Sequence, residues 1–261
     1  MRIDFEKWHG NGNDFVIVNS IDNKLKIRKN FIRKVSNRNE GVGFDQLIKI
    51  DLPTKEDHDF YVKFFNADGS EASMCLNGIR CAAHYVWNNY FSPQKKISFM
   101  TKAEIVECIP SGKTKVSVFI KNPVDINKPQ LQKALTKKFS NSFNLLNIGN
   151  NHLCIKMESI SKVDLAKIYK ELPKLAKDIE INLSIYKKEK NKINIRTYEN
   201  GVGETLSCGS ASLSVASIFI DNAKTPIEVS SFGGKLNFKK YNSGILMTGP
   251  TSFIFKGNID G

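Results

Sequence analysis

The sequence predicts an α/β protein of the α+β kind with two pseudo-symmetric domains. In each domain we expect a curved mixed or antiparallel sheet wrapped on a central helix. Two observations lead to this prediction. An internal repeat spans most of the 261 residues, and each copy places a cysteine, Cys75 or Cys208, directly before an apolar helical segment. Since the copies present these cysteines at equivalent positions, we expect the active site in the cleft between the domains.

The first helix is predicted from the apolar residues that follow Cys75. Between residues 79 and 90 they recur at three- and four-residue intervals, which is typical of an amphipathic helix. The first turn then falls near residues 76–78, so Cys75 lies at the helix N-terminus. Backbone N–H groups and the helix dipole favour negative charge there, so we expect a lowered pKa for a thiol at such a position. A single cysteine is more commonly a small buried hydrophobe, so the second copy carries the argument.

The repeat appears when Cys208 is placed on Cys75. A glutamate, Glu71 or Glu204, stands four residues before each cysteine. The other matching segments are YVKFF (61–65) and NIRTY (194–198), ISFMT (97–101) and IEVSS (227–231), KVSVFIKNP (115–123) and GILMTGP (244–250), and GNDFVIV (12–18) and GNNHLCI (149–155). A repeat of this length predicts two copies of one α/β unit.

The repeat also sets the predicted domain boundaries. The N-terminal domain, with the first cysteine, covers residues 1–121, and the C-terminal domain, with the second, covers residues 122–251. The tail, residues 252–261, is predicted to be a strand that returns to the N-terminal domain. We see no counterpart of this tail at the end of the first copy.

Two further segments have their own patterns. Residues 123–130, PVDINKPQ, are expected to form an irregular crossover, because Pro and Asp interrupt regular elements. Residues 159–173 are predicted to form a surface helix that Ser161 caps and Pro173 stops.

The composition is typical of a soluble globular protein, with 41% hydrophobic residues. The first ten residues contain no apolar stretch, so we expect neither a signal peptide nor a membrane span. The five cysteines form no CxxC pair and leave one over from any pairing, which favours reduced thiols in the cytoplasm and no metal site. The net charge of +13 is spread among asparagines and glutamates, so we expect a solvated Lys-rich surface and no nucleic-acid partner.

Two thiols at two helix N-termini suit one kind of reaction. Converging helix N-termini bind an anion such as a carboxylate. A thiolate on one side of the neighbouring carbon can remove its proton, while a thiol on the other side delivers a new one, which inverts the stereocentre. Because such a proton is very weakly acidic, donors around the carboxylate must stabilise the charge that develops. The sequence suggests neither a pyridoxal site nor metal ligands, so we expect a reaction without a cofactor.

Four motifs together resemble the diaminopimelate epimerase family. They are KWHGNGNDFVIVN (7–19), GVGFDQLI (41–48), FFNADGSEASMCLNGIRCAA (64–83) and YENGVGETLSCGSA (198–211). The resemblance implies a pyridoxal-independent isomerase of two pseudo-symmetric domains that interconverts LL- and meso-diaminopimelate for lysine and cell-wall precursor synthesis. It also implies a homodimer that binds a small amino-acid substrate, with Cys75 and Cys208 as the acid/base pair.

The resemblance assigns roles to the residues around the cysteines. His152 matches a histidine associated with the first cysteine, and Glu199 matches a glutamate associated with the second. The backbone N–H groups that would hold the α-carboxylate belong to Leu76, Asn77, Gly209 and Ser210. The side chains that match substrate-binding positions are Asn13, Gln46, Asn66, Asn150 and Asn182. Taken alone, asparagines in turns and a single histidine at the start of an apolar strand are usually structural.

Several positions depart from the family pattern. Leu76 stands where the family has glycine, which is tolerable if φ stays negative. Asn151 replaces a proline, and Ala211 and Ser212 replace Gly-Ala. Most importantly, Asn200 stands where the family has the arginine that meets the distal carboxylate of the substrate. A neutral amide does not reproduce a planar, always-charged guanidinium.

Three hypotheses therefore remain open from the sequence. The first is a diaminopimelate epimerase in which Asn66, Asn182 and Asn200 hold the distal carboxylate. The second is a related racemase of another amino acid, such as histidine, lysine or glutamate. The third is a non-catalytic basic protein that binds nucleic acid. The two cysteines and their paired glutamates argue against this third hypothesis.

Overall fold

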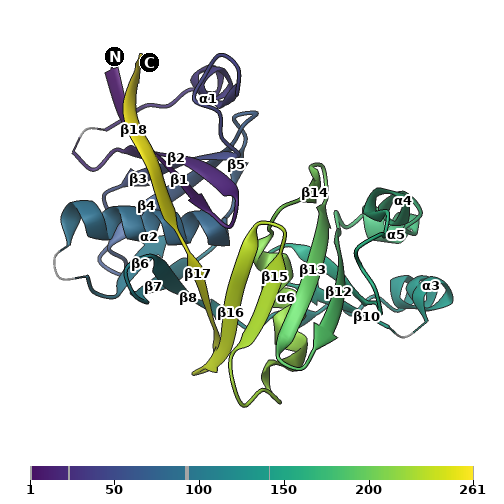
Figure 1. Cartoon of the computed structure of the whole chain (residues 1–261). Helices are drawn as coiled ribbons and strands as arrows, with labels where there is room; N and C mark the ends of the chain where they lie inside the picture. Colours follow the sequence, from purple (N-terminus) through teal and green to yellow (C-terminus); the bar gives the residue numbers. More distant parts are fainter. Residues whose placement is uncertain (1, 23, 92–93, 141, 261) are drawn as a thin grey trace. The chain divides into compact units, whose positions relative to one another are not determined.

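The protein consists of two compact units (Figure 1). The computed structural model describes residues 2–22, 24–91, 94–140 and 142–260. Unit 1 comprises residues 1–119 and 248–261, and unit 2 comprises residues 120–247. The chain enters unit 2 within β8 (Lys115–Lys121) and returns to unit 1 within β17 (Gly244–Pro250).

Unit 1 surrounds one long helix with a mixed sheet. Its other elements are β1 (Arg2–Gly10), β2 (Asn13–Asn19), α1 (Lys29–Ser36), β3 (Gln46–Asp51), β4 (Phe60–Asn66), β5 (Glu71–Ala72), α2 (Leu76–Tyr90), β6 (Ile97–Met100), β7 (Ile105–Pro110) and β18 (Ser252–Asp260). Helix α2 packs against β1, β2, β3 and β7. Most of its residues are buried, so it forms the centre of the core of unit 1.

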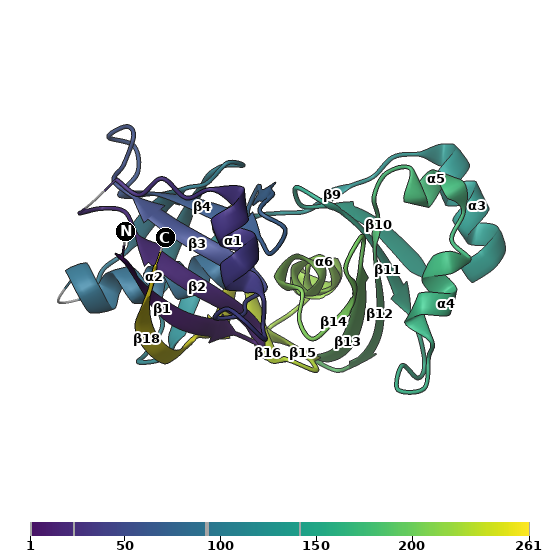
Figure 2. The same cartoon turned by 90° about the horizontal axis from the view of Figure 1, so that it is seen from above.

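Unit 2 repeats this plan around α6. Its elements are β9 (Val124–Asp125), α3 (Pro129–Phe139), β10 (Phe143–Asn147), β11 (Asn151–Lys156), α4 (Leu165–Lys170), α5 (Lys174–Lys177), β12 (Asn182–Glu189), β13 (Lys192–Glu199), β14 (Gly203–Thr205), α6 (Gly209–Ile220), β15 (Ile227–Ser231) and β16 (Gly234–Tyr241). Figure 2 shows α6 nearly end-on, with β11, β12 and β13 curving past it. The mixed α/β class that the sequence predicts is confirmed.

The strand pairings follow the same order in the two units. In unit 1, β2 pairs parallel with β3, β4 runs antiparallel to β3 and β5, and β4 pairs parallel with β6. In unit 2, β11 pairs parallel with β12, β13 runs antiparallel to β12 and β14, and β13 pairs parallel with β15. Helices α2 and α6 occupy the same place in this order. The internal repeat of the sequence is therefore a repeat of topology.

The prediction of an irregular crossover at residues 123–130 is wrong. Val124–Asp125 form β9, which pairs with Leu146 and Asn147 of β10, and Pro129 begins α3. Proline fits the first turn of a helix because the N–H that it lacks would have no intrahelical partner there. Strand β9 pairs with β10 as β18 pairs with β1. The C-terminal strand thus has a short counterpart after the first copy, which the sequence reading missed.

The surface helix predicted at residues 159–173 is shorter than expected, and its predicted cap is wrong. Helix α4 begins at Leu165, and the side chain of Asp164 accepts a hydrogen bond from the N–H of Lys167. Aspartate is as good a cap as serine, and it is the one that lies within reach of the third residue of the helix. Ser161 therefore has no capping role, and Pro173 lies after the helix as expected.

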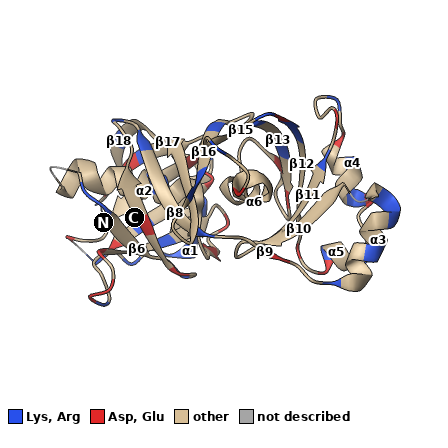
Figure 3. Cartoon of the chain, turned by 90° about the horizontal axis from the view of Figure 1, so that it is seen from below, with Lys and Arg blue, Asp and Glu red and all other residues tan. Residues whose placement is uncertain are grey.

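Lysine and arginine residues occur in both units, and several lie along α3 (Figure 3). One of them, Lys138, forms an ion pair with Glu171, at 2.9 Å. Among the helices in the described part of the chain, none has the length and apolar character needed to cross a bilayer.

The first turn of α2 depends on a glycine for close packing. A Cβ atom at Gly78 would lie 2.6 Å from the ring of Phe64 and 3.2 Å from both Phe15 and Ile48. We expect Gly78→Ala to destabilise the protein, because overpacking costs about 1–3 kcal/mol, whereas the gain in helix propensity is only about 1 kcal/mol. Asn88→Ala, at an exposed position of the same helix, should be neutral or stabilising. Urea unfolding measures both, and a Gly78→Ala protein as stable as the wild type would contradict the prediction.

Candidate active site

Each predicted catalytic cysteine occupies the N-cap position of a central helix. Cys75 precedes α2 with φ −138° and ψ 115°, and Cys208 precedes α6 with φ −115° and ψ 115°. The predicted helix starts are therefore confirmed. The first intrahelical hydrogen bonds run from Ile79 N–H to the carbonyl of Cys75, and from Ser212 N–H to that of Cys208. The N–H groups between these residues precede the hydrogen-bond ladder and can face a ligand.

The residues predicted to hold a carboxylate lie in these two first turns. Leu76 and Asn77 begin α2, and Gly209 and Ser210 begin α6. Leu76 is part of the helix and has no positive φ, so a side chain at this position is compatible with the fold.

Asn13 connects Cys75 to the β1–β2 turn. Its Oδ1 atom accepts hydrogen bonds from Cys75 Sγ, at 3.6 Å, and from Asn77 Nδ2, at 3.4 Å. Its Nδ2 atom donates to Asp45 Oδ2, at 2.7 Å. Because Asp45 can only accept, this contact turns the amide oxygen of Asn13 toward the thiol. The structure thus brings three of the predicted residues, Asn13, Cys75 and Asn77, together.

A charged network supports Asn13, and the sequence reading did not identify it. Arg38 binds Asp14 through two nitrogens, at 2.8 and 3.0 Å, and Asp45 through one, at 3.0 Å. Lys7 also binds Asp14, at 2.6 Å. Burial raises the pKa of Asp14, but the hydrogen bonds and charges of Arg38 and Lys7 outweigh it and bring this pKa to about 2. In the sequence, the only sign of this network is that Asp14 and Asp45 end the similar segments GNGND and GVGFD.

Gln46 and Asn66 face each other across β3 and β4. Gln46 Nε2 donates to Asn66 Oδ1, at 2.9 Å, and Asn66 Nδ2 donates to Ser70 Oγ, at 3.0 Å. The Oε1 atom of Gln46 is buried and has no hydrogen-bond partner. A buried acceptor without a partner is costly, so this oxygen can readily accept from a ligand.

Cys208 is more deeply buried than Cys75, with 7% of its surface exposed. Its Sγ lies 3.3 Å from Ser210 Oγ. Burial raises the pKa of the Cys208 thiol well above its usual value, and the nearby negative charge of Glu199 raises it further. The expectation of a lowered thiol pKa is therefore wrong at Cys208, because desolvation and a carboxylate outweigh the helix N-terminus. Thr205 Oγ1 orients Glu199 with a hydrogen bond of 2.6 Å.

His152 lies in unit 2 and is fully buried. Its Nε2 atom is 3.0 Å from Asn150 Oδ1 and 3.1 Å from Ser210 Oγ. Burial lowers its pKa to about 4, so the ring is neutral near pH 7. Since Ser210 also contacts Cys208, the structure joins His152, Asn150, Ser210 and Cys208 in one cluster.

Asn182 and Asn200 are also neighbours. Asn200 N–H donates to Asn182 Oδ1, at 3.0 Å. The hydroxyl of Tyr169 donates to Asn200 Oδ1, at 2.6 Å, and its ring stacks on Tyr198 with centroids 4.4 Å apart. The sequence reading missed Tyr169, because it comes from α4 and nothing in the local sequence relates it to the end of β13.

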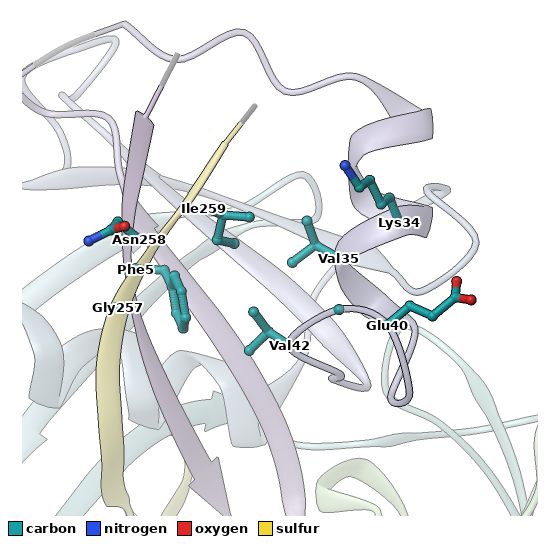
Figure 4. Close-up of a pocket in the computed structure, with 9 residues that line it drawn as sticks. Phe5, Lys34, Val35, Glu40, Val42, Gly257, Asn258 and Ile259 are labelled. Atoms are coloured by element: carbon teal, nitrogen blue, oxygen red, sulfur yellow. The ribbon is translucent and has the colours of Figure 1, made fainter.

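A cavity of about 230 Å³ in unit 1 lies elsewhere (Figure 4). Phe5, Val35 and Val42 line it, with Lys34 and Glu40 among its other residues. None of the predicted site residues contributes to it. It borders the hydrophobic cluster beneath β1 and β18 and is distinct from the surroundings of Cys75.

The described residues contain no group of three or more His, Cys, Asp or Glu side chains arranged to hold a metal ion. Their five cysteines form no disulfide.

Residues 5–124 and 144–254 match the family model described as diaminopimelate epimerase. The chain belongs to the diaminopimelate epimerase family. Within this family of isomerases, a diaminopimelate epimerase from Methanocella arvoryzae is 33% identical over 278 residues, which cover 99% of this chain and 97% of the relative. A diaminopimelate epimerase from a Psychrobacter species is 31% identical over 286 residues, covering 98% and 94%.

The fold of this family member is also similar to a solved structure. A phenazine biosynthesis protein of the PhzF family from Enterococcus faecalis matches with a TM-score of 0.72 over 100% of both chains. The two sequences are 13% identical, so this likeness concerns the fold alone.

The buried His152 should make stability depend on pH. An imidazole whose folded-state pKa is about 4, against 6.5 in the unfolded chain, contributes stability that is complete above pH 6.5 and is lost as the pH falls toward 4. The loss should reach about 3 kcal/mol. Urea unfolding between pH 7 and pH 4 should show a smaller decline for His152→Gln than for the wild type. Equal declines would contradict the assigned environment.

Glu199 should control the ionisation of Cys208. Glu199→Gln removes the negative charge that opposes the thiolate, so the pKa of Cys208 should fall. Alkylation of Cys208 by iodoacetamide, followed by peptide mass spectrometry, should then begin at lower pH. Glu189→Gln is the matched control, since Glu189 is exposed in the same unit. If Glu199→Gln leaves the profile unchanged, or Glu189→Gln shifts it equally, the assignment is wrong.

Proposed function

We propose that the protein interconverts LL- and meso-diaminopimelate without a cofactor, by proton transfer between two thiols and Cα. The observation that carries the proposal is the pair of cysteines at equivalent N-cap positions of α2 and α6. A structural role would not require a thiol at the same position of both copies. Membership of the diaminopimelate epimerase family supports the same conclusion.

In the proposed reaction the two thiols act on opposite faces of Cα. One cysteine, as thiolate, takes the α-proton, and the electron pair of the C–H bond moves onto the carboxylate. The other cysteine, as thiol, gives its proton to the opposite face and becomes a thiolate. The protein ends with the same total number of protons, and the stereocentre is inverted.

The first turns of α2 and α6 are suited to the charge that develops on the carboxylate. Backbone N–H groups of Leu76 and Asn77, and of Gly209 and Ser210, precede the hydrogen-bond ladders of the two helices. Such groups are already oriented before the substrate binds, so they stabilise the developing charge without reorganisation. We assign them to the α-carboxylate.

Cys208 and Glu199 form the acid side of the pair in this proposal. Burial and the Glu199 carboxylate raise the pKa of Cys208, so it is a thiol when the substrate arrives. Cys75, which is partly exposed and contacts the neutral amide of Asn13, is the corresponding base. For the opposite stereoisomer the roles are reversed. His152, which is neutral, then acts through Ser210 as a positioning group for α6.

The distal end of the substrate is assigned to Asn66, Asn182 and Asn200. Tyr169 donates to the side-chain oxygen of Asn200, which leaves the NH₂ group to donate to a carboxylate. Asn200 also favours the second candidate function, that of a racemase of another amino acid such as histidine, lysine or glutamate. A neutral amide provides no charge to select a distal carboxylate.

Replacement of either cysteine should separate proton exchange from inversion. Cys75→Ala and Cys208→Ala should each lower net epimerisation by about 10²–10⁴-fold, because each face of Cα needs its own proton carrier. In D₂O, the remaining thiol can still exchange the α-proton of one isomer. Cys154→Ala, which removes a buried thiol far from either N-cap in sequence, should keep normal turnover. Near-normal epimerisation by Cys208→Ala would refute the two-thiol reaction.

The substrate is tested at Asn200. If diaminopimelate is the substrate, Asn200→Arg should lower its KM on the order of tenfold with little change in kcat, since a charge-assisted contact exceeds a neutral one by about 1 kcal/mol or more. Asn194→Arg adds the same charge at an exposed position of β13 and serves as the control. Loss of activity in Asn200→Arg toward an amino acid without a distal carboxylate would favour the racemase.

The homodimer and the cytoplasmic location stay predictions. One feature supports self-association. Three consecutive residues of β18, Phe253, Ile254 and Phe255, are 44–50% exposed, which is unusual for large apolar side chains in a row.

A further inference from the structure

Arg80 is an arginine buried in the core of unit 1. It lies in α2, one turn after Leu76, and none of its surface is exposed. Its Nη2 donates to Asn11 Oδ1, at 3.0 Å, and its Nη1 donates weakly to the carbonyl of Leu76, at 3.4 Å. Its Nε atom has no partner, and no described carboxylate forms an ion pair with it. The charge of Arg80 is thus surrounded only by neutral groups.

A charge in this situation is costly. Taking an ion out of water costs several kcal/mol unless a counter-ion and hydrogen bonds replace the water. Two neutral acceptors and one unpartnered N–H are poor compensation for a guanidinium with five donors. Lys7 and Arg38, the cationic groups of the network that supports Asn13, both have aspartate partners. Arg80 is the exception.

The titratable groups that the charge of Arg80 reaches are three thiols. They are Cys81 in α2, Cys75 at its N-cap and Cys108 in β7. Cys81 and Cys108 are completely buried, and burial raises the pKa of Cys81 to about 12 and that of Cys108 further. Both therefore remain neutral. Cys75 is partly exposed, so it is the thiol that can ionise and complete an ion pair.

Arg80 also holds the turn that carries Asn13. Asn11, which accepts its hydrogen bond, has a left-handed backbone with φ 56° and is 2% exposed. A Cβ atom on Gly10 would lie 3.2 Å from Arg80 Nη2 and 3.5 Å from Cys81 Sγ, so the guanidinium lies directly against this turn. Asn13, two residues after Asn11, contacts Cys75 Sγ.

We propose that Arg80 is a positioning residue for Cys75, whose buried positive charge stabilises the Cys75 thiolate and whose hydrogen bond to Asn11 keeps Asn13 against the thiol. The inference rests on the proposed function in that Cys75 is taken to be a base. Asp14 and Asp45, which lie in the network at Asn13, pair with Lys7 and Arg38 and form no ion pair with Arg80.

The test is the pH dependence of Cys75 alkylation in the whole protein without substrate. Iodoacetamide reacts with the thiolate, and peptide mass spectrometry reads Cys75 separately from the other cysteines. In Arg80→Met the pH of half-maximal reaction should rise by roughly one unit. Arg80→Lys, which retains the charge, should shift it less. Arg2→Gln removes an exposed positive charge from the same unit and should leave it unchanged.

Asn11→Asp provides a variant that keeps the size of the side chain. A carboxylate at this position would pair with Arg80 and cancel its charge, so the Cys75 profile should again move to higher pH. If Arg80→Met does not fold, the alkylation profile of Asn11→Asp tests the proposal by itself. A folded Asn11→Asp or Arg80→Met protein with the wild-type profile would overturn the proposal, as would equal shifts in Arg80→Met and Arg80→Lys.

This measurement is independent of the proposed reaction. If Cys75→Ala retained epimerisation, the reaction assigned to Cys75 would fail while its reactivity profile still reported on Arg80. If the profile does not respond to Arg80, the inference fails and the cysteine variants still test the reaction.

Discussion

The position of each predicted catalytic thiol depends on the burial of the helix that follows it. Helices α2 and α6 are buried over most of their length and packed on strands of their own unit. In α2 the packing extends into the first turn, where Gly78 leaves no room for a Cβ beside Phe64. A helix held so closely cannot shift along its axis without creating clashes or cavities. The N-cap cysteine and the N–H groups next to it are consequently fixed relative to the sheet. This does not require the cysteine or the N–H groups to be buried.

The same helix position produces two different electrostatic environments. Near Cys75, the amide of Asn13 contacts the thiol and also accepts a hydrogen bond from Asn77, and the charge of Arg80 acts on the thiol. At Cys208 the neighbours are a carboxylate and a hydroxyl. A helix N-terminus contributes similarly to both, so the difference comes from the surrounding side chains, some on neighbouring strands and some on the helices themselves. In the proposed reaction such a difference matters, since one thiol must start as a base and the other as an acid.

Asn200, which stands where the family resemblance leads us to expect an arginine, is less isolated than it looks in the sequence. Tyr169 from α4 orients the Asn200 amide, and the backbone of Asn200 is held by Asn182. These contacts make the Asn200 amide an ordered neutral donor. A neutral donor discriminates less strongly between a carboxylate and another polar group, because much of the strength of an arginine–carboxylate contact comes from charge.

The sequence by itself determined the elements and their repetition. Apolar periodicity locates α2 behind Cys75, and the spacing around Cys208 locates its equivalent, because these patterns arise from local backbone geometry. The prediction from sequence failed at residues 123–130, where a long-range strand pairing decides the structure. It also failed at Ser161, because Asp164 is equally good as a cap and is better placed. Only the tertiary structure showed that Asp45 orients Asn13, that Tyr169 reaches Asn200, and that Arg80 is buried without a counter-ion. These contacts join residues that are 31 to 69 positions apart. Their energies depend on burial and on the partner that packing brings close, and neither quantity is encoded in local sequence spacing.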